Sequence, residues 1–209
     1  MSQSPAMSVD MRRALDRDFI READMFFEAR GEVHQTMRRL IKRLEKAAIP
    51  YAVMGGMAVN AHGHERMTKD VDVLLTRKGF DEFCKRHVPK DYAQVPGRPR
   101  RLVDRKNQRT IDILITGHFH GRGHPGPFAF PNPEDVRELI KNTHYINLET
   151  LIQLKLAARR WRDFADVVDL IRVHNLDEAY LDKLHPSVRQ DFIECLEEKR
   201  REDEYEALP

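Results

Sequence analysis

The chain has 209 residues, 41% of them hydrophobic and 33% charged, which is typical of one compact soluble protein. Its 36 basic and 34 acidic residues leave a net charge of +2, so the overall charge does not indicate a nucleic-acid-binding protein. Cys84 and Cys195 are too few for a disulfide framework, no apolar run is long enough to cross a membrane, and residues 1–10 lack the apolar core of a signal peptide. We therefore expect a cytoplasmic protein with no membrane partner.

The spacing of apolar residues predicts two helices before the first strand. Residues 1–30 are expected to form a disordered leader followed by a charged helix. After Gly31, apolar residues recur with helical spacing as far as Ala48, and Pro50 ends this second helix because proline cannot donate a backbone hydrogen bond.

The segment from Tyr51 to Leu75 contains the most informative pattern. A short apolar run ends at Gly55-Gly56, a small-residue segment with helical spacing follows, and a second apolar run contains Asp70 and Asp72. Alternate residues of a strand point to the same face, so the two carboxylates stand side by side, about 7 Å apart. Like charges in a Val/Leu strand repel each other and resist desolvation, and a divalent cation removes that conflict. The alternative is that Asp70 caps the strand and Asp72 is an exposed strand residue.

The double glycine favours the cation, because Gly-Gly between a strand and a helix lets the backbone approach a phosphate. The whole segment resembles the signature of the nucleotidyltransferase superfamily, which has the DNA polymerase β-like fold. In that signature the carboxylates of Asp-hydrophobic-Asp hold Mg²⁺ or Mn²⁺ for an NTP. A third carboxylate is expected on a later strand, and Asp112 is a lone acid in an apolar run. The resemblance implies that Gly55 and Gly56 bind phosphate and that Asp70, Asp72 and Asp112 bind metal.

The loop before Asp70 contains His62, His64 and Arg66. A metal site at the histidines is one interpretation, but loop histidines are mostly structural or solvated, and we favour that reading. Arg66-Met-Thr-Lys-Asp-Val-Asp resembles an Arg-x-Thr-x-Asp-x-Asp pattern in one branch of the superfamily, which implies that Arg66 binds a triphosphate oxygen. A surface salt bridge from Arg66 to Glu65 or Asp70 is the alternative.

A basic arm, residues 97–109, precedes the strand of Asp112. One acid, Asp104, stands against six basic residues: Arg98, Arg100, Arg101, Arg105, Lys106 and Arg109. Lys106-Asn107 predicts a hairpin turn. The arm suits phosphate groups of an NTP or of a nucleic-acid backbone, although a solvated strand edge that resists aggregation has the same composition.

After the arm, residues 117–133 predict an irregular loop. His118, His120 and His124 have no thiol or acidic partner at ligand spacing, which argues against a zinc site there. Asn132-Pro133 predicts the start of a helix, because asparagine caps helices and proline suits their first position. Beyond His174, two further helices are expected.

Lys155 lies in the middle of the apolar face of a helix capped by Asn147. A buried lysine needs an anionic partner or shifts its pKa. On the next predicted helix, Asp163 and Asp166 share one face with Val167. A structural ion pair and a contact with NTP phosphates both remain open, and we expect the second.

The run from Lys155 to Asp166 is similar to the Lys…Arg-x-Lys-Asp-x-x-Asp motif of the AbiEii/MenT-type toxin nucleotidyltransferases, with Arg162 where that family usually has lysine. The two motifs span residues 54–166. The resemblance implies that Lys155 and Asp163 complete the catalytic site, with Lys155 also binding nucleotide. It also implies an acceptor such as the 3′ end of a tRNA, and a cognate antitoxin. The chain is shorter than many such toxins, so their larger acceptor-binding lobe is expected to be reduced or absent.

We therefore expect an α/β (α+β) fold. A nucleotidyltransferase core with a small mixed sheet flanked by helices would occupy residues 31–130, and a helical C-terminal lobe residues 131–209. The expected function is metal-dependent transfer of a nucleoside monophosphate from an NTP to a hydroxyl of tRNA, protein or a small molecule. The alternative is a non-catalytic NTP- or RNA-binding protein on the same fold.

Overall fold

A seven-stranded mixed sheet organises the computed structural model, which describes residues 21–23, 25–119 and 126–208. Its strand order is β3-β4-β5-β2-β1-β7-β6. The β1–β7 and β2–β5 pairs are parallel, and the other four pairs are antiparallel. The strands are β1 (Tyr51–Met54), β2 (Asp70–Leu75), β3 (Tyr92–Val95), β4 (Arg98–Asp104), β5 (Thr110–Ile115), β6 (Arg137–Ile140) and β7 (Thr143–Ile146).

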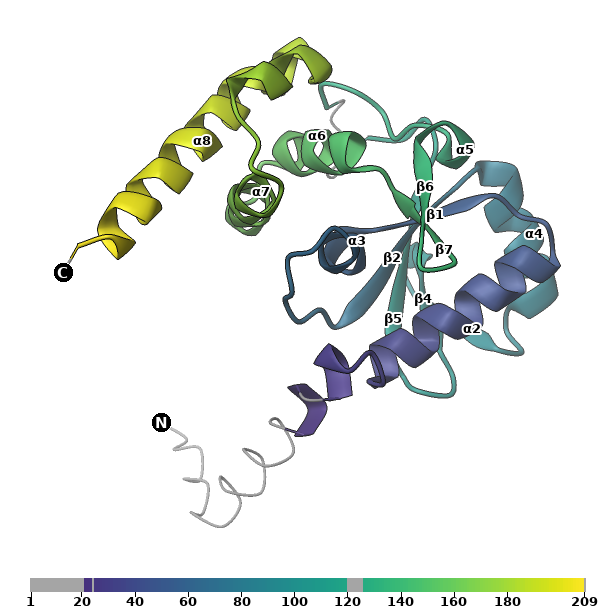
Figure 1. Ribbon diagram of the computed structural model, residues 1–209. Coiled ribbons are helices and arrows are strands. Elements are labelled where there is room, and N and C mark those ends of the chain that lie inside the picture. Colours follow the sequence, from purple (N-terminus) through teal and green to yellow (C-terminus); the bar gives the residue numbers. More distant parts are fainter. Residues whose placement is uncertain (1–20, 24, 120–125, 209) are drawn as a thin grey trace, which may run out of the picture.

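Helices cover both faces of the sheet. Figure 1 shows α2 and α4 on one side, and α3, α6 and α7 on the other, with α8 packed on the outside of α7. The helices are α2 (Glu32–Lys46), α3 (Gly55–Ala61), α4 (Arg77–His87), α5 (Pro133–Val136), α6 (Leu148–Ala158), α7 (Trp161–His174), the 3₁₀ helix η1 (Glu178–Lys183) and α8 (Pro186–Glu206). This arrangement confirms the predicted fold class.

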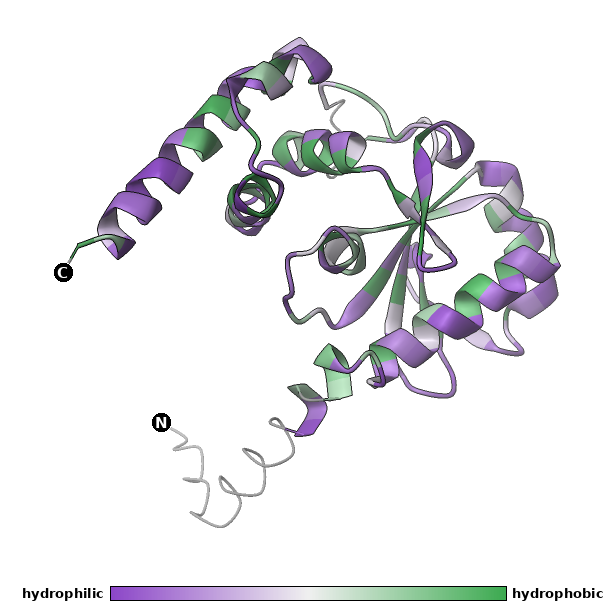
Figure 2. Cartoon of the chain, viewed as in Figure 1, coloured by the Kyte–Doolittle hydropathy of each residue, from purple (hydrophilic) through white to green (hydrophobic). Residues whose placement is uncertain are grey.

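The apolar pattern explains these layers. Figure 2 shows hydrophobic residues concentrated in the central strands and on the sides of the helices that face them. On β2, Val71, Val73 and Leu75 are fully buried, and on α2 the predicted helical stripe is buried at Leu40 and Leu44. Burial of apolar surface from both sides therefore fixes the position of β2 in the middle of the sheet.

A buried acid joins α2 to the β4–β5 hairpin. Asp104, at the end of β4, accepts a hydrogen bond from Thr36 Oγ1 at 3.0 Å and forms an ion pair with Arg39. Its other oxygen accepts the backbone N–H of Lys106 at 3.0 Å, in the predicted hairpin turn. The one acid of the basic arm thus holds the hairpin against the helix.

Residues 137–146 differ from the sequence-based expectation. Asn132 caps α5 as predicted, accepting the Glu134 N–H at 3.1 Å, but α5 ends after four residues. The chain then forms β6 and β7, and β7 pairs with β1, so the sheet extends into the part expected to be helical. Lys141 and Asn142 both have positive φ, 46° and 64°, which gives the two-residue turn between these strands. Pairing with β1 is a tertiary contact, which local helix signals do not report.

Other elements follow the prediction closely. Beyond His174, where two helices are expected, the chain forms the short helix η1 and the final helix α8. Asn147 caps α6 by accepting the Thr150 N–H at 2.9 Å. The leader at residues 1–20, and His120 and His124, lie outside the described residues. Within the described ranges, no helix has the length and apolar character needed to cross a membrane.

Candidate functional site

Three carboxylates project from one face of the sheet. Asp70 and Asp72 are alternate residues of β2, and Asp72 is the register partner of Asp112 on the parallel strand β5. Register partners point to the same side of a sheet. The structure therefore brings together the three acids that the sequence predicts as metal ligands, on the face covered by α3 and α6.

Position 55 requires glycine because its backbone lies against the Asp72 carboxylate. Its φ is +60°, and a Cβ atom built on it would lie 1.9 Å from Asp72 Oδ2. Any side chain would displace the carboxylate, and the left-handed backbone conformation favours glycine as well. Gly56 has a different role, because its hypothetical Cβ would lie 2.8 Å from both Cβ and Oγ1 of Thr68. The first glycine faces the carboxylates, and the second lets the Thr68 loop pack closely.

Asp72 lies in an unfavourable environment for a negative charge. Burial, and then the charges of Asp70 and Asp112, raise its pKa to about 7, although Lys155 and Arg160 oppose the shift. Asp70 accepts a hydrogen bond from Thr68 Oγ1 at 3.1 Å. No side chain in the described ranges donates a hydrogen bond to Asp72 or forms an ion pair with it. Its charge is therefore the least compensated of the three.

Asp112 is paired with an arginine of the basic arm. Arg101, its neighbour on β4, donates from Nε at 2.6 Å and from Nη2 at 2.5 Å to the two carboxylate oxygens. The other arm residues diverge: Arg100 contacts His118, Arg105 contacts the Pro89 carbonyl, and Arg109 pairs with Glu22 and Glu32. Because neighbouring residues of a strand point to opposite faces, the arm does not present one continuous basic surface.

Lys155 forms the centre of a buried charge network. Only 6% exposed, it donates from Nζ to Asp163 at 3.2 Å and to Asp166 at 2.5 Å. Arg160 donates to the second oxygen of Asp163 at 2.5 Å. Of the two alternatives for Lys155, the structure contains the ion pair, and a contact with NTP phosphates stays a prediction.

Arg66 belongs to the same network. It forms a two-point ion pair with Asp166, with Nε–Oδ1 at 2.5 Å and Nη2–Oδ2 at 2.8 Å. Its nitrogens and those of Lys155 hold the pKa of Asp166 below its usual range despite burial. The expected alternative, a surface salt bridge to Glu65 or Asp70, is wrong, because the partner lies on α7, far along the chain.

The histidines before Asp70 have structural contacts. His62 is buried, and its Nε2 lies 2.8 Å from the Ile146 carbonyl oxygen. His64 Nε2 lies 3.1 Å from Asp169 Oδ2. In the described part of the chain, no cluster of three or more His, Cys, Asp or Glu side chains is arranged to hold a metal ion as it stands. Of the three carboxylates, Asp112 is the one paired with an arginine, Arg101.

A cleft of about 170 Å³ collects most of the predicted site residues. Five of them line it, together with side chains that the sequence analysis did not assign to the site, notably Arg160. The predicted residues that line it are Gly55, Asp72, Asp112, Lys155 and Asp163. Asp70, Gly56 and Arg66 adjoin these residues but do not line it. Arg160 occupies the first position of the Arg-x-Lys-Asp motif, and that match could have identified it as a site residue.

Solved structures provide the comparison for this architecture. The crystal structure of an antigenic nucleotidyltransferase-like protein from Paracoccidioides brasiliensis matches with a TM-score of 0.52 and 16% identity, over 82% of this chain and 89% of that chain. A putative nucleotidyltransferase from H. pylori matches with a TM-score of 0.47 and 18% identity, over 79% of this chain and 76% of that chain. JHP933 from Helicobacter pylori matches with a TM-score of 0.45 and 18% identity, over 72% of this chain and 70% of that chain. No protein-family model and no curated protein matches the sequence. The first of these similarities shows that the chain has a nucleotidyltransferase-like fold.

Replacing Asp72 by asparagine should stabilise the fold at neutral and higher pH. The pKa of Asp72 is about 7 in the folded state and 3.8 ordinarily, so between pH 3.8 and pH 7 the folded protein binds more protons than the unfolded chain. The folded wild type therefore loses stability as the pH rises through this range. Asp72→Asn removes that loss, with a gain on the order of 2 kcal/mol above pH 7. Thermal melts from pH 5 to pH 8 measure it, and exposed Asp182→Asn is the control. A difference between variant and wild type that does not grow with pH would contradict the assignment.

Replacing Lys155 by methionine should destabilise the fold. Asp163 and Asp166 would remain buried with one arginine partner each, and breaking a buried pair costs on the order of 3 kcal/mol. Urea unfolding at pH 7 measures the loss, with exposed Lys78→Met as the control. A Lys155→Met variant as stable as wild type would show that the network does not depend on this lysine and would favour the phosphate-binding role.

Proposed function

We propose that the protein transfers a nucleoside monophosphate from an NTP to an acceptor hydroxyl and releases pyrophosphate. The observation that carries this proposal is the packing of Asp72 against Gly55, with Asp70 and Asp112 on the same face. Strand β1 ends just before Gly55, and Gly55 lies beside the carboxylate of Asp72. The backbone of Gly55 and the Asp72 carboxylate therefore line the same small cleft. The nucleotidyltransferase-like fold is consistent with this chemistry and does not by itself establish it.

The residues present fit a hard divalent cation. Mg²⁺ and Mn²⁺ prefer oxygen ligands, and the three acids supply only carboxylate oxygens. Burial, and then repulsion from Asp70 and Asp112, raise the pKa of Asp72, and a cation bound beside these carboxylates would favour its charged form. Asp70 and Asp72 would hold the metal with the nucleotide phosphates, and Asp112 would join them or accept the proton of the acceptor hydroxyl. When bound, the metal neutralises charge on the phosphates and polarises the reacting one.

The cleft offers cations for the triphosphate. The Arg160 side chain is 72% exposed, and its guanidinium still has free donors beyond its bond to Asp163. Lys155 is buried in the wall of the same cleft and adds a second positive charge there. At about 170 Å³ the cleft is smaller than a typical nucleotide pocket of roughly 300 Å³ or more, so it suits the phosphates, with the base lying outside.

A nucleic-acid acceptor is favoured by Trp161. This indole is 93% exposed at the start of α7, and Arg160 and Arg162 flank it in the chain. An exposed aromatic among arginines stacks bases of single-stranded nucleic acid without sequence preference. We therefore place a single-stranded RNA end, such as the 3′ end of a tRNA, ahead of a protein or a small molecule. A toxin role with a cognate antitoxin stays a prediction.

Transfer assays test the proposal. The protein is incubated with each α-labelled NTP, Mg²⁺ and total RNA or protein, and we expect label on RNA that depends on the divalent cation. Asp70→Asn and Asp72→Asn should each reduce transfer at least 100-fold, because the metal loses a charged ligand, whereas Asp182→Asn should not. Absence of transfer to any acceptor, with NTP binding equal in EDTA and in Mg²⁺, would favour the non-catalytic binding protein instead.

Trp161→Ala should weaken the acceptor interaction selectively. Loss of one stacked base is worth about 1–3 kcal/mol, so KM for RNA should rise roughly tenfold or more. KM for the NTP should stay within twofold, and Tyr205→Ala, another exposed aromatic, should change neither constant. If the KM for RNA is unchanged, Trp161 is not an acceptor contact and the protein or small-molecule acceptor becomes the better hypothesis.

A further inference from the structure

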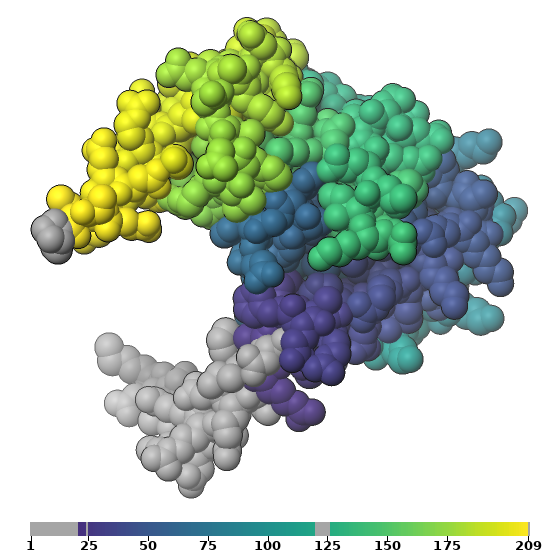
Figure 3. All heavy atoms as spheres, viewed as in Figure 1, coloured from purple at the N-terminus to yellow at the C-terminus, as the bar shows by residue number. Residues whose placement is uncertain are grey.

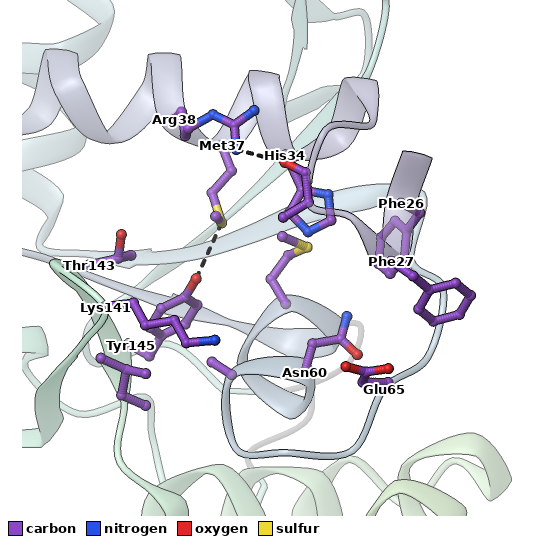
Figure 4. Close-up of a pocket in the computed structure, with 14 residues that line it drawn as sticks. Phe26, Phe27, His34, Met37, Arg38, Asn60, Glu65, Lys141, Thr143 and Tyr145 are labelled. Atoms are coloured by element: carbon purple, nitrogen blue, oxygen red, sulfur yellow. Dashed lines mark hydrogen bonds between the residues drawn. The ribbon is translucent and has the colours of Figure 1, made fainter. Parts of the chain in front are cut away.

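A second cavity, of about 330 Å³, lies on another part of the molecule. It lies between the segment that leads into α2, the helix α3 and the turn joining β6 to β7 (Figure 4). In Figure 3 the green residues of that turn lie beside the purple and blue residues at the start of the described chain. None of its lining residues lines the candidate cleft, so the two spaces are separate.

One wall of the cavity is aromatic and sulfur-rich. Phe26, Met37, Met57 and Tyr145 are buried around it, whereas Phe27 is half exposed at its edge. The Phe26 and Phe27 rings meet edge to face with centroids 5.5 Å apart. Flat aromatic surfaces and adaptable methionines favour a planar apolar body in such a space.

An unpartnered polar atom lies in this wall. His34 is only 9% exposed, and its Nδ1 has no hydrogen-bond partner. Burial, and secondarily Arg38, lower the pKa of His34, so the ring is neutral at pH 7. A buried polar atom without a partner is destabilising, and a bound group that forms a hydrogen bond with it would remove that cost.

The charged side chains that line the cavity give it a net positive charge. Arg38 is fixed by a hydrogen bond from Nη1 to the Ala29 carbonyl at 2.8 Å, and Asn60 is occupied by two bonds to the Arg66 backbone. Lys141 extends from the β6–β7 turn toward the space that His34 reaches from α2 (Figure 4). Glu65 is the one acid among the described residues that line the cavity. Two cations against one carboxylate favour an anion.

We propose that this cavity is a binding site for a small organic anion with an aromatic body. The rings would pack between Met57, Tyr145 and the phenylalanines. Lys141 would pair with the anionic group, and His34 Nδ1 would form a hydrogen bond with a polar atom of the ligand. The volume lies at the lower end of the range of small-molecule pockets, about 300–1,000 Å³.

Two fluorescent probes with the same rings test the proposal. The first, 8-anilinonaphthalene-1-sulfonate, carries an anionic group, and the second, N-phenyl-1-naphthylamine, does not. We expect each folded chain to bind one molecule of the sulfonate probe with high affinity. Lys141→Gln should weaken its binding about tenfold and leave the neutral probe within twofold, because only the charge pair is lost. Ala61→Phe, which fills the cavity from α3, should abolish binding of both probes.

Matched controls separate this cavity from the rest of the surface. Lys78→Gln removes an exposed lysine elsewhere, and Ala158→Phe enlarges an alanine that lines the candidate cleft. Both should bind the probes as wild type does. If thermal melts show that Ala61→Phe is unfolded, the smaller Ala61→Leu is measured in its place. Absence of a stoichiometric probe site, or a site unaffected by filling the cavity, would overturn the proposal, and equal loss of both probes in Lys141→Gln would overturn its anionic character.

Discussion

The contact between Asp72 and the Gly55 backbone is the constraint around which the rest of the site is arranged. A carboxylate can lie this close to a turn only because residue 55 has no side chain and adopts a positive φ. The contact holds the start of α3 against β2, and the parallel pairing of β2 with β5 then brings Asp112 alongside Asp72. Three acids share one face because two strands are in register.

Charge compensation around this face is uneven. Arg101 neutralises Asp112, and Lys155, Arg66 and Arg160 together outnumber Asp163 and Asp166. Asp72 has no direct partner among the described side chains, and burial, followed by the charges of Asp70 and Asp112, raises its pKa. Buried ion pairs contribute little net stability when desolvation is included, but they fix side chains in one geometry. Here they tie α6 and α7 to the loop before β2.

The two cavities differ in a way that matches their proposed ligands. The cleft is small and lined by acids together with Lys155 and Arg160, which suits phosphates and a metal ion. The cavity beside α2 is larger, aromatic and weakly positive, which suits an organic anion. Its lining includes Lys141, which the two-residue turn between β6 and β7 positions. The strands that the sequence analysis missed thus contribute one side of the second cavity.

The sequence by itself determined the local features: the helical stripe of α2, the caps of α6 and α5, the buried position of Lys155, and the shared face of Asp70 and Asp72. Each depends on a periodicity or a cap within a few residues, which physical chemistry constrains directly. Only the tertiary structure decided that Arg66 pairs with Asp166, that Arg101 pairs with Asp112, and that residues 137–146 join the sheet. These outcomes depend on partners distant in the chain, whose choice follows from packing and charge compensation across the whole fold, not from local spacing.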